Sequence, residues 1–95
     1  MSAPTPLIAL FRLGRIVATP NALASLSQDD IQTALRRHQA GDWGDVCDED
    51  CQANDCALAE GTRVFSVYHA ANGVKFWVIT ESDRRTTTVL LPEDY

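Results

Sequence analysis

The sequence predicts a small α+β domain: an N-terminal strand, two to three short helices, then a three-stranded antiparallel β-meander. Apolar residues recur at helical spacing between about residues 20 and 60, and at every second position from Thr62 onward. The pair Asn72-Gly73 inside the second region is typical of a β-hairpin turn. Because 95 residues suit one hydrophobic core, we expect a single domain over residues 1–95.

The first 26 residues predict a lead, a strand and a short helix. Residues 1–6 contain two prolines and no periodicity, which indicates a flexible lead. Residues 11–18 alternate or run apolar and predict a strand that can join the sheet. The pair Thr19-Pro20 stops this strand, and it offers an N-cap and a proline at the first position of a helix that continues to Leu26.

A second helix is predicted from the cap residue Ser27 through about His38. Its first turn is acidic, its apolar residues fall at helical spacing, and Gly41 terminates it. The glycines at 41 and 44 then force a turn that projects Trp43, and we expect this ring to fill part of the core.

A third helix is predicted to begin at Cys47 or Asp48 and to end at Gly61. Three acidic residues in its first turn complement the helix dipole. The expected inner stripe is Cys47, Cys51 and Leu58, with Asn54 between them.

Three strands are predicted. The first covers residues 64–69, the second ends at Thr80, and the third covers residues 86–91. A two-residue type I′ turn at Asn72-Gly73 needs a positive φ at both residues, and it sets Tyr68 directly opposite Trp77. These two rings would share a second apolar sheet face with Ile79 and Leu90. That face needs a cover, which is either the N-terminal segment or a second copy of the chain in a homodimer.

The charge of the chain is concentrated in one segment. The net charge is −5, and residues 41–60 hold seven carboxylates and no Lys or Arg. Such a segment is either the solvated face of a helix or a docking face that repels nucleic acid and attracts a basic protein surface. The candidate binding residues are Asp42, Asp45, Asp48, Glu49, Asp50, Asp55, Tyr68 and Trp77.

Motifs for enzymatic chemistry are weak in this sequence. Cys47, Cys51 and Cys56 lack the CxxC spacing of a zinc knuckle, so neither a metal nor a cofactor is predicted. A hydrolase or nuclease remains the alternative, with His38 as base, Asp42, Glu81 or Asp83 as its orienting group, and Ser66 or Ser82 as nucleophile. Direct DNA binding would require the four arginines at 12, 15, 36 and 37 to converge.

The cellular setting is predicted from what the chain contains. Its longest apolar run, residues 7–11, falls far short of the ~20 residues that span a bilayer, and no basic signal region precedes it. The chain has three cysteines, which cannot all pair with one another, so a disulfide framework is not indicated. We therefore expect a cytoplasmic protein without a membrane partner.

Several separated blocks carry a resemblance that covers about residues 14–95. The blocks are 38–44 (HQAGDWG), 54–55 (ND), 66–68 (SVY), 76–84 (FWVITESDR) and 87–95 (TTVLLPEDY). In these blocks the chain resembles small proteins encoded on bacterial plasmids, integrative elements and prophages, which are often labelled type I restriction subunits. The resemblance implies the company of conjugation, plasmid-maintenance and anti-defence proteins, and it carries over no functional residue.

Together these observations predict a non-enzymatic binding protein of a mobile element. The specific expectation is an inhibitor of host restriction or CRISPR defence, whose acidic segment occupies the basic surface of a defence nuclease or effector complex. The alternatives are the small hydrolase or nuclease around His38 and Asp42, and a regulator of plasmid maintenance.

Overall fold

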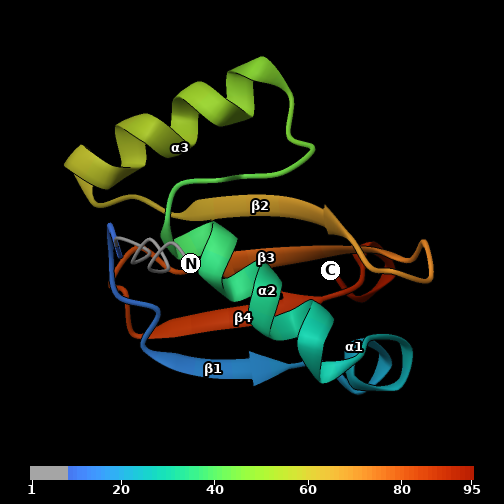
Figure 1. Cartoon of the computed structure of the whole chain (residues 1–95). Coiled ribbons are helices and arrows are strands. Elements are labelled where there is room, and N and C mark those ends of the chain that lie inside the picture. Colours follow the sequence, from blue (N-terminus) through green and yellow to red (C-terminus); the bar gives the residue numbers. More distant parts are fainter. Residues whose placement is uncertain (1–8) are drawn as a thin grey trace, which may run out of the picture.

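The computed structural model describes residues 9–95, which form three α-helices and a four-stranded mixed sheet (Figure 1). The predicted α+β class is confirmed. The flexible lead expected over residues 1–6 lies outside the described residues. In chain order the elements are β1 (Arg15–Ala18), α1 (Pro20–Ser25), α2 (Gln28–Gln39), α3 (Asp48–Glu60), β2 (Val64–His69), β3 (Lys75–Thr80), β4 (Thr86–Leu90) and the 3-10 turn η1 (Pro92–Asp94).

The sheet has the strand order β1-β4-β3-β2. β2, β3 and β4 form the expected antiparallel meander. The N-terminal strand joins it at the β4 edge and runs parallel to β4, with Arg15 opposite Thr86 and Ala18 opposite Val89. The first and last thirds of the chain are therefore held together by backbone pairing.

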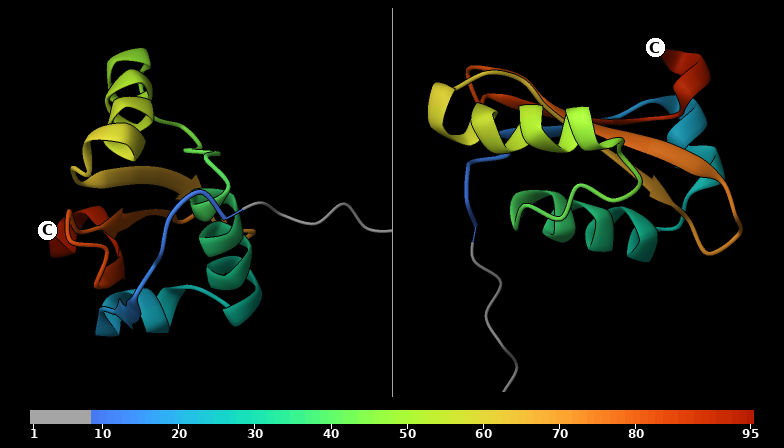
Figure 2. Two further views of the ribbon diagram at one scale, coloured as in Figure 1. Left: turned by 90° about the vertical axis from the view of Figure 1, so that its left-hand side faces the viewer. Right: turned by 90° about the horizontal axis from the view of Figure 1, so that it is seen from above.

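The helices lie on different sides of this sheet. α1 and α2 cover one face, η1 lies against the opposite face, and α3 runs along the outer edge of β2 (Figures 1 and 2). The face under α1 and α2 holds the main core, whereas the other face is covered only in part. We call this second side the open face. The main core comprises Ala22, Leu26, Ala34, Tyr68, Ala70, Phe76, Val78, Val89 and Leu91.

The helix boundaries follow the predicted caps. The Thr19 side chain accepts from the Ala22 N–H (3.2 Å), and Ser27 forms a capping box with Asp30. α3 ends at Gly61, whose φ of 73° is left-handed. Cys47 stands at the N-cap of α3 but makes no side-chain cap bond.

The predicted inner stripe of α3 is wrong in part. Asn54 and Ala57 are its buried residues, Cys51 and Leu58 are half-buried, and Cys47 is exposed. The physical reason is that α3 packs against the edge of β2 and not onto a broad sheet face, so its contact stripe is narrow.

The predicted hairpin register is wrong by one residue. Of the two residues Asn72 and Gly73, only Gly73 has a positive φ (87°), and its N–H donates to the Ala70 carbonyl (2.9 Å). The amide of Asn72 instead donates to the Ser25 carbonyl (2.9 Å) and accepts from the Val74 N–H (3.1 Å). These bonds fix a three-residue loop ending in a left-handed glycine, in place of a two-residue type I′ turn.

The slip of one residue moves every side chain of β2 to the other face. Tyr68 now lies opposite Phe76, and Val67 lies opposite Trp77. The expectation that Tyr68 and Trp77 share a face is therefore wrong. Tyr68 is 2% exposed beneath α2, where Arg37 lies over its ring (4.7 Å) and its hydroxyl donates to the Asp42 carbonyl (2.6 Å).

Candidate functional site: an acidic helix and an aromatic hollow

The helix α3 is attached to the body of the protein by a few specific bonds. The side chain of Asn54 pairs with the backbone of β2 as a strand would: its amide donates to the Phe65 carbonyl (2.6 Å) and its oxygen accepts from the Phe65 N–H (3.0 Å). Near the other end, the Arg84 guanidinium donates to the carbonyls of Ala57 (3.0 Å) and Thr62 (2.6 Å). These bonds satisfy edge and helix-end groups that burial would otherwise leave unpaired.

A small second core lies beneath α3. Trp43 is 3% exposed, as predicted for a ring that fills the core, and it packs with the fully buried Val64 and Ala57. Phe11 stacks on the Trp43 ring with centroids 6.2 Å apart. Of the residues of α3, only Asn54 and Ala57 are buried, so most of the helix surface faces outward.

The seven carboxylates of residues 41–60 fall into two groups. Asp42 accepts from Arg37 (2.7 Å), and this bond is the main cause of the lowered pKa of Asp42. Asp45 lies 2.8 Å from His69, and Asp55 accepts from the indole N–H of Trp43 (3.1 Å). The carboxylates on α3 that form neither an ion pair nor a side-chain hydrogen bond with a described residue are Asp48, Glu49, Asp50 and Glu60.

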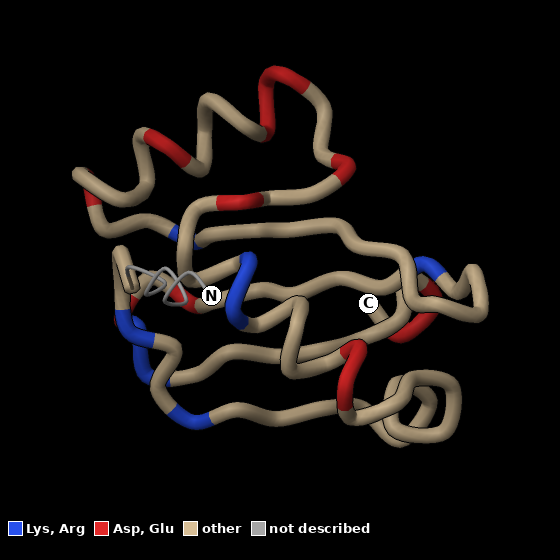
Figure 3. Tube along the Cα trace, in the orientation of Figure 1, with Lys and Arg blue, Asp and Glu red and all other residues tan. Residues whose placement is uncertain are grey.

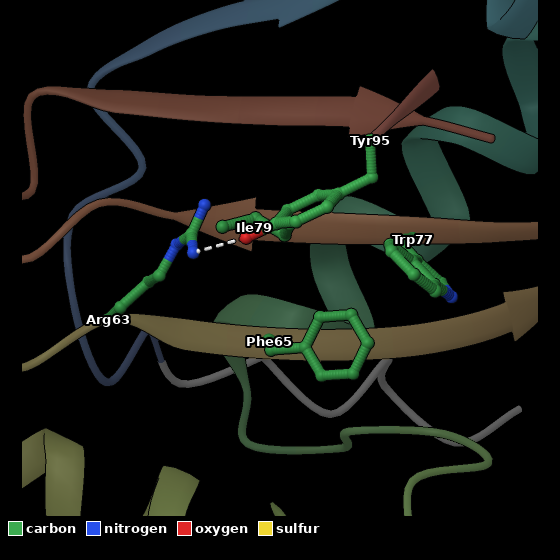
Figure 4. Close-up of a pocket in the computed structure, with 5 residues that line it drawn as sticks. All are labelled: Arg63, Phe65, Trp77, Ile79 and Tyr95. Carbon is green, nitrogen blue, oxygen red and sulfur yellow. Dashed lines mark hydrogen bonds between the residues drawn. The ribbon is translucent and has the colours of Figure 1, made fainter. Parts of the chain in front are cut away.

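An aromatic hollow of about 260 Å³ lies on the open face beside β2 (Figure 4). Trp77 meets Phe65 edge-on (5.1 Å between centroids) and Tyr95 at 5.6 Å. The Arg63 guanidinium donates to the Tyr95 hydroxyl (2.9 Å) and lies 3.5 Å from the Glu81 carboxylate. Ile79 forms the floor of the hollow. We call the five lining residues, Arg63, Phe65, Trp77, Ile79 and Tyr95, the aromatic hollow.

Four members of this hollow, Arg63, Phe65, Ile79 and Tyr95, were not among the predicted site residues. Arg63 precedes β2 and shares a face with Phe65 by simple alternation, so the period of the strand was a signal that could have identified it. Tyr95, which is 71% exposed, is placed by η1 after the last strand, and no periodicity signals its position. Trp77 was predicted, and its indole N–H is buried without an acceptor among the described residues.

His38 lies at the centre of a buried polar chain. Its Nδ1 is 2.5 Å from the Ser66 hydroxyl and its Nε2 is 2.9 Å from the Thr80 hydroxyl. Thr80 bonds to Thr87 (2.7 Å), which donates to the Leu13 carbonyl (2.7 Å). Since that carbonyl only accepts, the hydroxyl protons run toward Leu13 and the imidazole carries its proton on Nε2. Burial lowers the pKa of His38 to about 3, so the ring is neutral.

The residues of the hydrolase alternative do not come together as an accessible site. His38 and Ser66 are in contact, but both are completely buried, so a substrate has no access to the hydroxyl. Asp42 pairs with Arg37 and not with His38. Glu81 pairs with Arg63, and Asp83 accepts from the Arg85 N–H (3.0 Å). The contact between His38 and Ser66 therefore joins α2 to β2 inside the core.

The three cysteines belong to one helix and its N-cap, and Arg36 and Arg37 have different surroundings. Cys47, Cys51 and Cys56 are free thiols on α3 or at its N-cap. Across residues 9–95, no three His, Cys, Asp or Glu side chains are grouped so that they could hold a metal ion. Arg37 is turned to Asp42 and Tyr68, whereas Arg36 lines a hollow beside Leu13.

Comparison with models of protein families, with curated proteins and with solved structures finds no match for this chain. Among the described residues, no helix combines the length and the apolar character needed to cross a membrane. The acidic helix and the aromatic hollow are the two surface features from which a function can be argued.

Proposed function

We propose that this chain is a non-enzymatic binding protein that docks its helix α3 on a basic protein surface. The observation that carries the proposal is the placement of α3: the helix buries only Asn54 and Ala57 and extends along the outer edge of the sheet (Figures 1 and 3). Residues 41–60, which include the helix, contain no Lys or Arg that could balance its carboxylates. A helix in this position presents negative charge outward instead of covering the main core.

The unpaired carboxylates supply the attraction. Asp48, Glu49 and Asp50 form the first turn, where they offset the helix dipole, and Glu60 lies at the other end of the helix. Their summed field accelerates encounter with a basic surface and weakens as salt is added. Asp42 contributes less to this field, because the charge of the Arg37 guanidinium balances its own.

The aromatic hollow supplies an apolar anchor next to the acidic helix. Asn54 of α3 bonds to the backbone of Phe65, whose ring lines the hollow, so the two features share β2. Trp, Tyr and Arg are the residue types that most often dominate the binding energy of interfaces, and Trp77, Tyr95 and Arg63 are grouped here. Charge then guides the encounter and the hollow prolongs it.

The partner in the proposal is a nucleic-acid-binding protein whose basic groove α3 occupies in place of phosphates. The resemblance to proteins of mobile elements makes a host restriction or CRISPR effector the specific form of the proposal. Such an inhibitor needs no catalytic residues, only carboxylates spaced on a rigid element.

A matched pair of variants tests the role of α3. The double variant Glu49→Gln/Asp50→Asn removes two carboxylates from the helix, and Asp29→Asn/Glu93→Gln removes two exposed carboxylates elsewhere. Both pairs change the net charge equally, and both include a carboxylate in the first turn of a helix. Nuclease-treated bacterial lysate is passed over each immobilised protein at low and high salt, and captured proteins are identified by mass spectrometry.

We expect a basic partner that the wild type and the control retain at low salt and that the α3 variant loses. Titration with that partner should show a steeper salt dependence for the wild type than for the α3 variant. Tyr95→Ala should weaken binding without changing the circular dichroism spectrum, because this ring is mostly exposed. A partner bound equally by both double variants would contradict the proposal, as would the absence of any basic partner.

A further inference from the structure

The two edges of the sheet differ in how they are closed. At the β2 edge, the Val67 N–H donates to the Trp43 carbonyl (3.0 Å) and the Val67 carbonyl accepts from Asp45 (2.8 Å), while Asn54 pairs with Phe65. At the other edge, no described residue pairs with the outer side of β1. An exposed edge is a template for another strand.

The groups that β1 offers follow from its pairing with β4. Arg15 donates to the Arg85 carbonyl (2.8 Å) and Thr19 donates to the Val89 carbonyl (3.0 Å). In parallel pairing, alternate residues direct both backbone groups to the same neighbour. The N–H and C=O groups of Ile16 and Ala18 therefore point away from the sheet.

Apolar side chains border this edge on the side of the helices. Ile16 is 48% exposed and Leu23 is 62% exposed. Ile16 lines two hollows against α2, one with Ile31 and one with Leu35. A strand added beside β1 would cover Ile16 and extend the apolar layer under α2.

On the open face, the two ends of β1 carry charges of opposite sign. Arg15 lies at the start of the strand and, by alternation, points to the same face as Val17 and Thr19. The Thr19 hydroxyl, just past the end of the strand, donates to the Asp94 carboxylate (2.6 Å). Two β1 strands running antiparallel would thus bring the basic end of each beside the acidic end of the other.

We propose that β1 pairs antiparallel with β1 of a second copy of this chain, so that two four-stranded sheets become one. In the register that uses all outward groups, Ile16 faces Ala18 of the second copy, each pair exchanging two backbone hydrogen bonds, and Val17 faces its own counterpart on the twofold axis. Arg15 then faces Thr19 of the second copy, whose hydroxyl holds Asp94. The two α3 helices lie at the far ends of the joined sheet, so the dimer presents two acidic helices.

Light scattering over a concentration series from about 10 µM to about 1 mM tests the association, because small interfaces have weak affinities. The wild-type mass should rise from the 10.4 kDa of one chain toward twice that value. Ile16→Pro removes one outward N–H at an edge position that tolerates proline, and it should keep the protein monomeric. Arg15→Glu should also weaken the dimer, whereas Lys75→Glu, with the same charge change on β3, should not.

Engineered cysteines test the register in a background carrying Cys47→Ser, Cys51→Ser and Cys56→Ser. Val17→Cys places two thiols opposite each other in a non-hydrogen-bonded pair, at a Cα separation that a disulfide can bridge. Ile16→Cys is the matched control, because its neighbour across the axis is Ala18. We expect intermolecular disulfides for Val17→Cys far in excess of Ile16→Cys.

Two results would overturn the proposal. One is a mass of a single chain at all concentrations together with equal cross-linking of the two cysteine variants. The other is a dimer that persists in Ile16→Pro and shows no preference for Val17→Cys, since such a dimer uses another surface, for example the aromatic hollow. Urea unfolding of each variant shows whether it is folded, and the cross-linking comparison does not depend on the proline variant.

Discussion

Acidification toward pH 4.5 should destabilise this fold mainly through one buried histidine. His38 is completely buried and its pKa in the folded protein is about 3, against 6.5 for an ordinary histidine. In the unfolded chain the ring takes up a proton as the pH falls through 6.5, whereas the folded protein excludes that proton until about pH 3. The stability is therefore complete above pH 6.5 and decreases as the pH falls.

The magnitude follows from proton linkage. One proton bound only by the unfolded state lowers the free energy of unfolding by about 1.4 kcal/mol per pH unit, so two units below pH 6.5 cost roughly 2 to 3 kcal/mol. Asp42 and Asp94 have pKa values below the ordinary 3.8, so their contributions are lost only at lower pH. In urea the midpoint of unfolding should fall by roughly 1 to 2 M.

The assay is urea unfolding followed by circular dichroism at several pH values from about 8 to about 4.5. The variant His38→Gln should be less stable at pH 7 but should lose most of the pH dependence in this range, because it has no imidazole to protonate. His69→Gln, at an exposed position, should keep the wild-type slope. An equal midpoint at both ends of the range, or a wild-type slope in His38→Gln, would refute the buried neutral histidine.

Two further predictions concern the β2 edge. Gly44 and Gly61 share a φ of 73°, but a Cβ at Gly44 would overlap the Val67 carbonyl oxygen, whereas Gly61 has no atom within 4 Å. Gly44→Ala should therefore lower the melting temperature far more than Gly61→Ala, which should cost only about 1 to 2 kcal/mol, and equal losses would contradict this contact. Asn54→Ala leaves both backbone groups of Phe65 unpaired and should cost roughly 2 to 4 kcal/mol in urea unfolding; a loss below 1 kcal/mol would show that water replaces the amide.

The local sequence determined the kinds of elements and many of their ends. Thr19, Ser27 and Gly61 cap helices in the structure as the sequence predicts, because a cap needs only a side chain or a backbone conformation within a few residues. The change of hydrophobic period after Thr62 predicted the meander for the same reason. The acidic segment was also visible in the sequence, and it does lie on and before one exposed helix.

Tertiary contacts decided the register and therefore the composition of each face. The amide of Asn72 bonds to Ser25, a residue 47 positions earlier, and this contact competes with the turn that the pair Asn72-Gly73 favours by itself. The slip of one residue buried Tyr68 and left Trp77 on the open face with Arg63 and Tyr95. No local pattern encodes a contact made by a distant backbone carbonyl, so only the assembled fold could set this register.

The partners of individual polar residues were likewise set by the fold. In the sequence His38, Ser66 and Asp42 resembled parts of a catalytic site, but α2 placed His38 inside the core and turned Arg37 to Asp42. In the same way, β1 was predictable as a strand, whereas its position at an open edge depended on parallel pairing with β4 across 70 residues of chain. Local patterns in the sequence determined which segments form strands and helices and where the charged side chains lie along the chain. Burial and edge position depended on distant segments, because only packing decides which polar groups lose water.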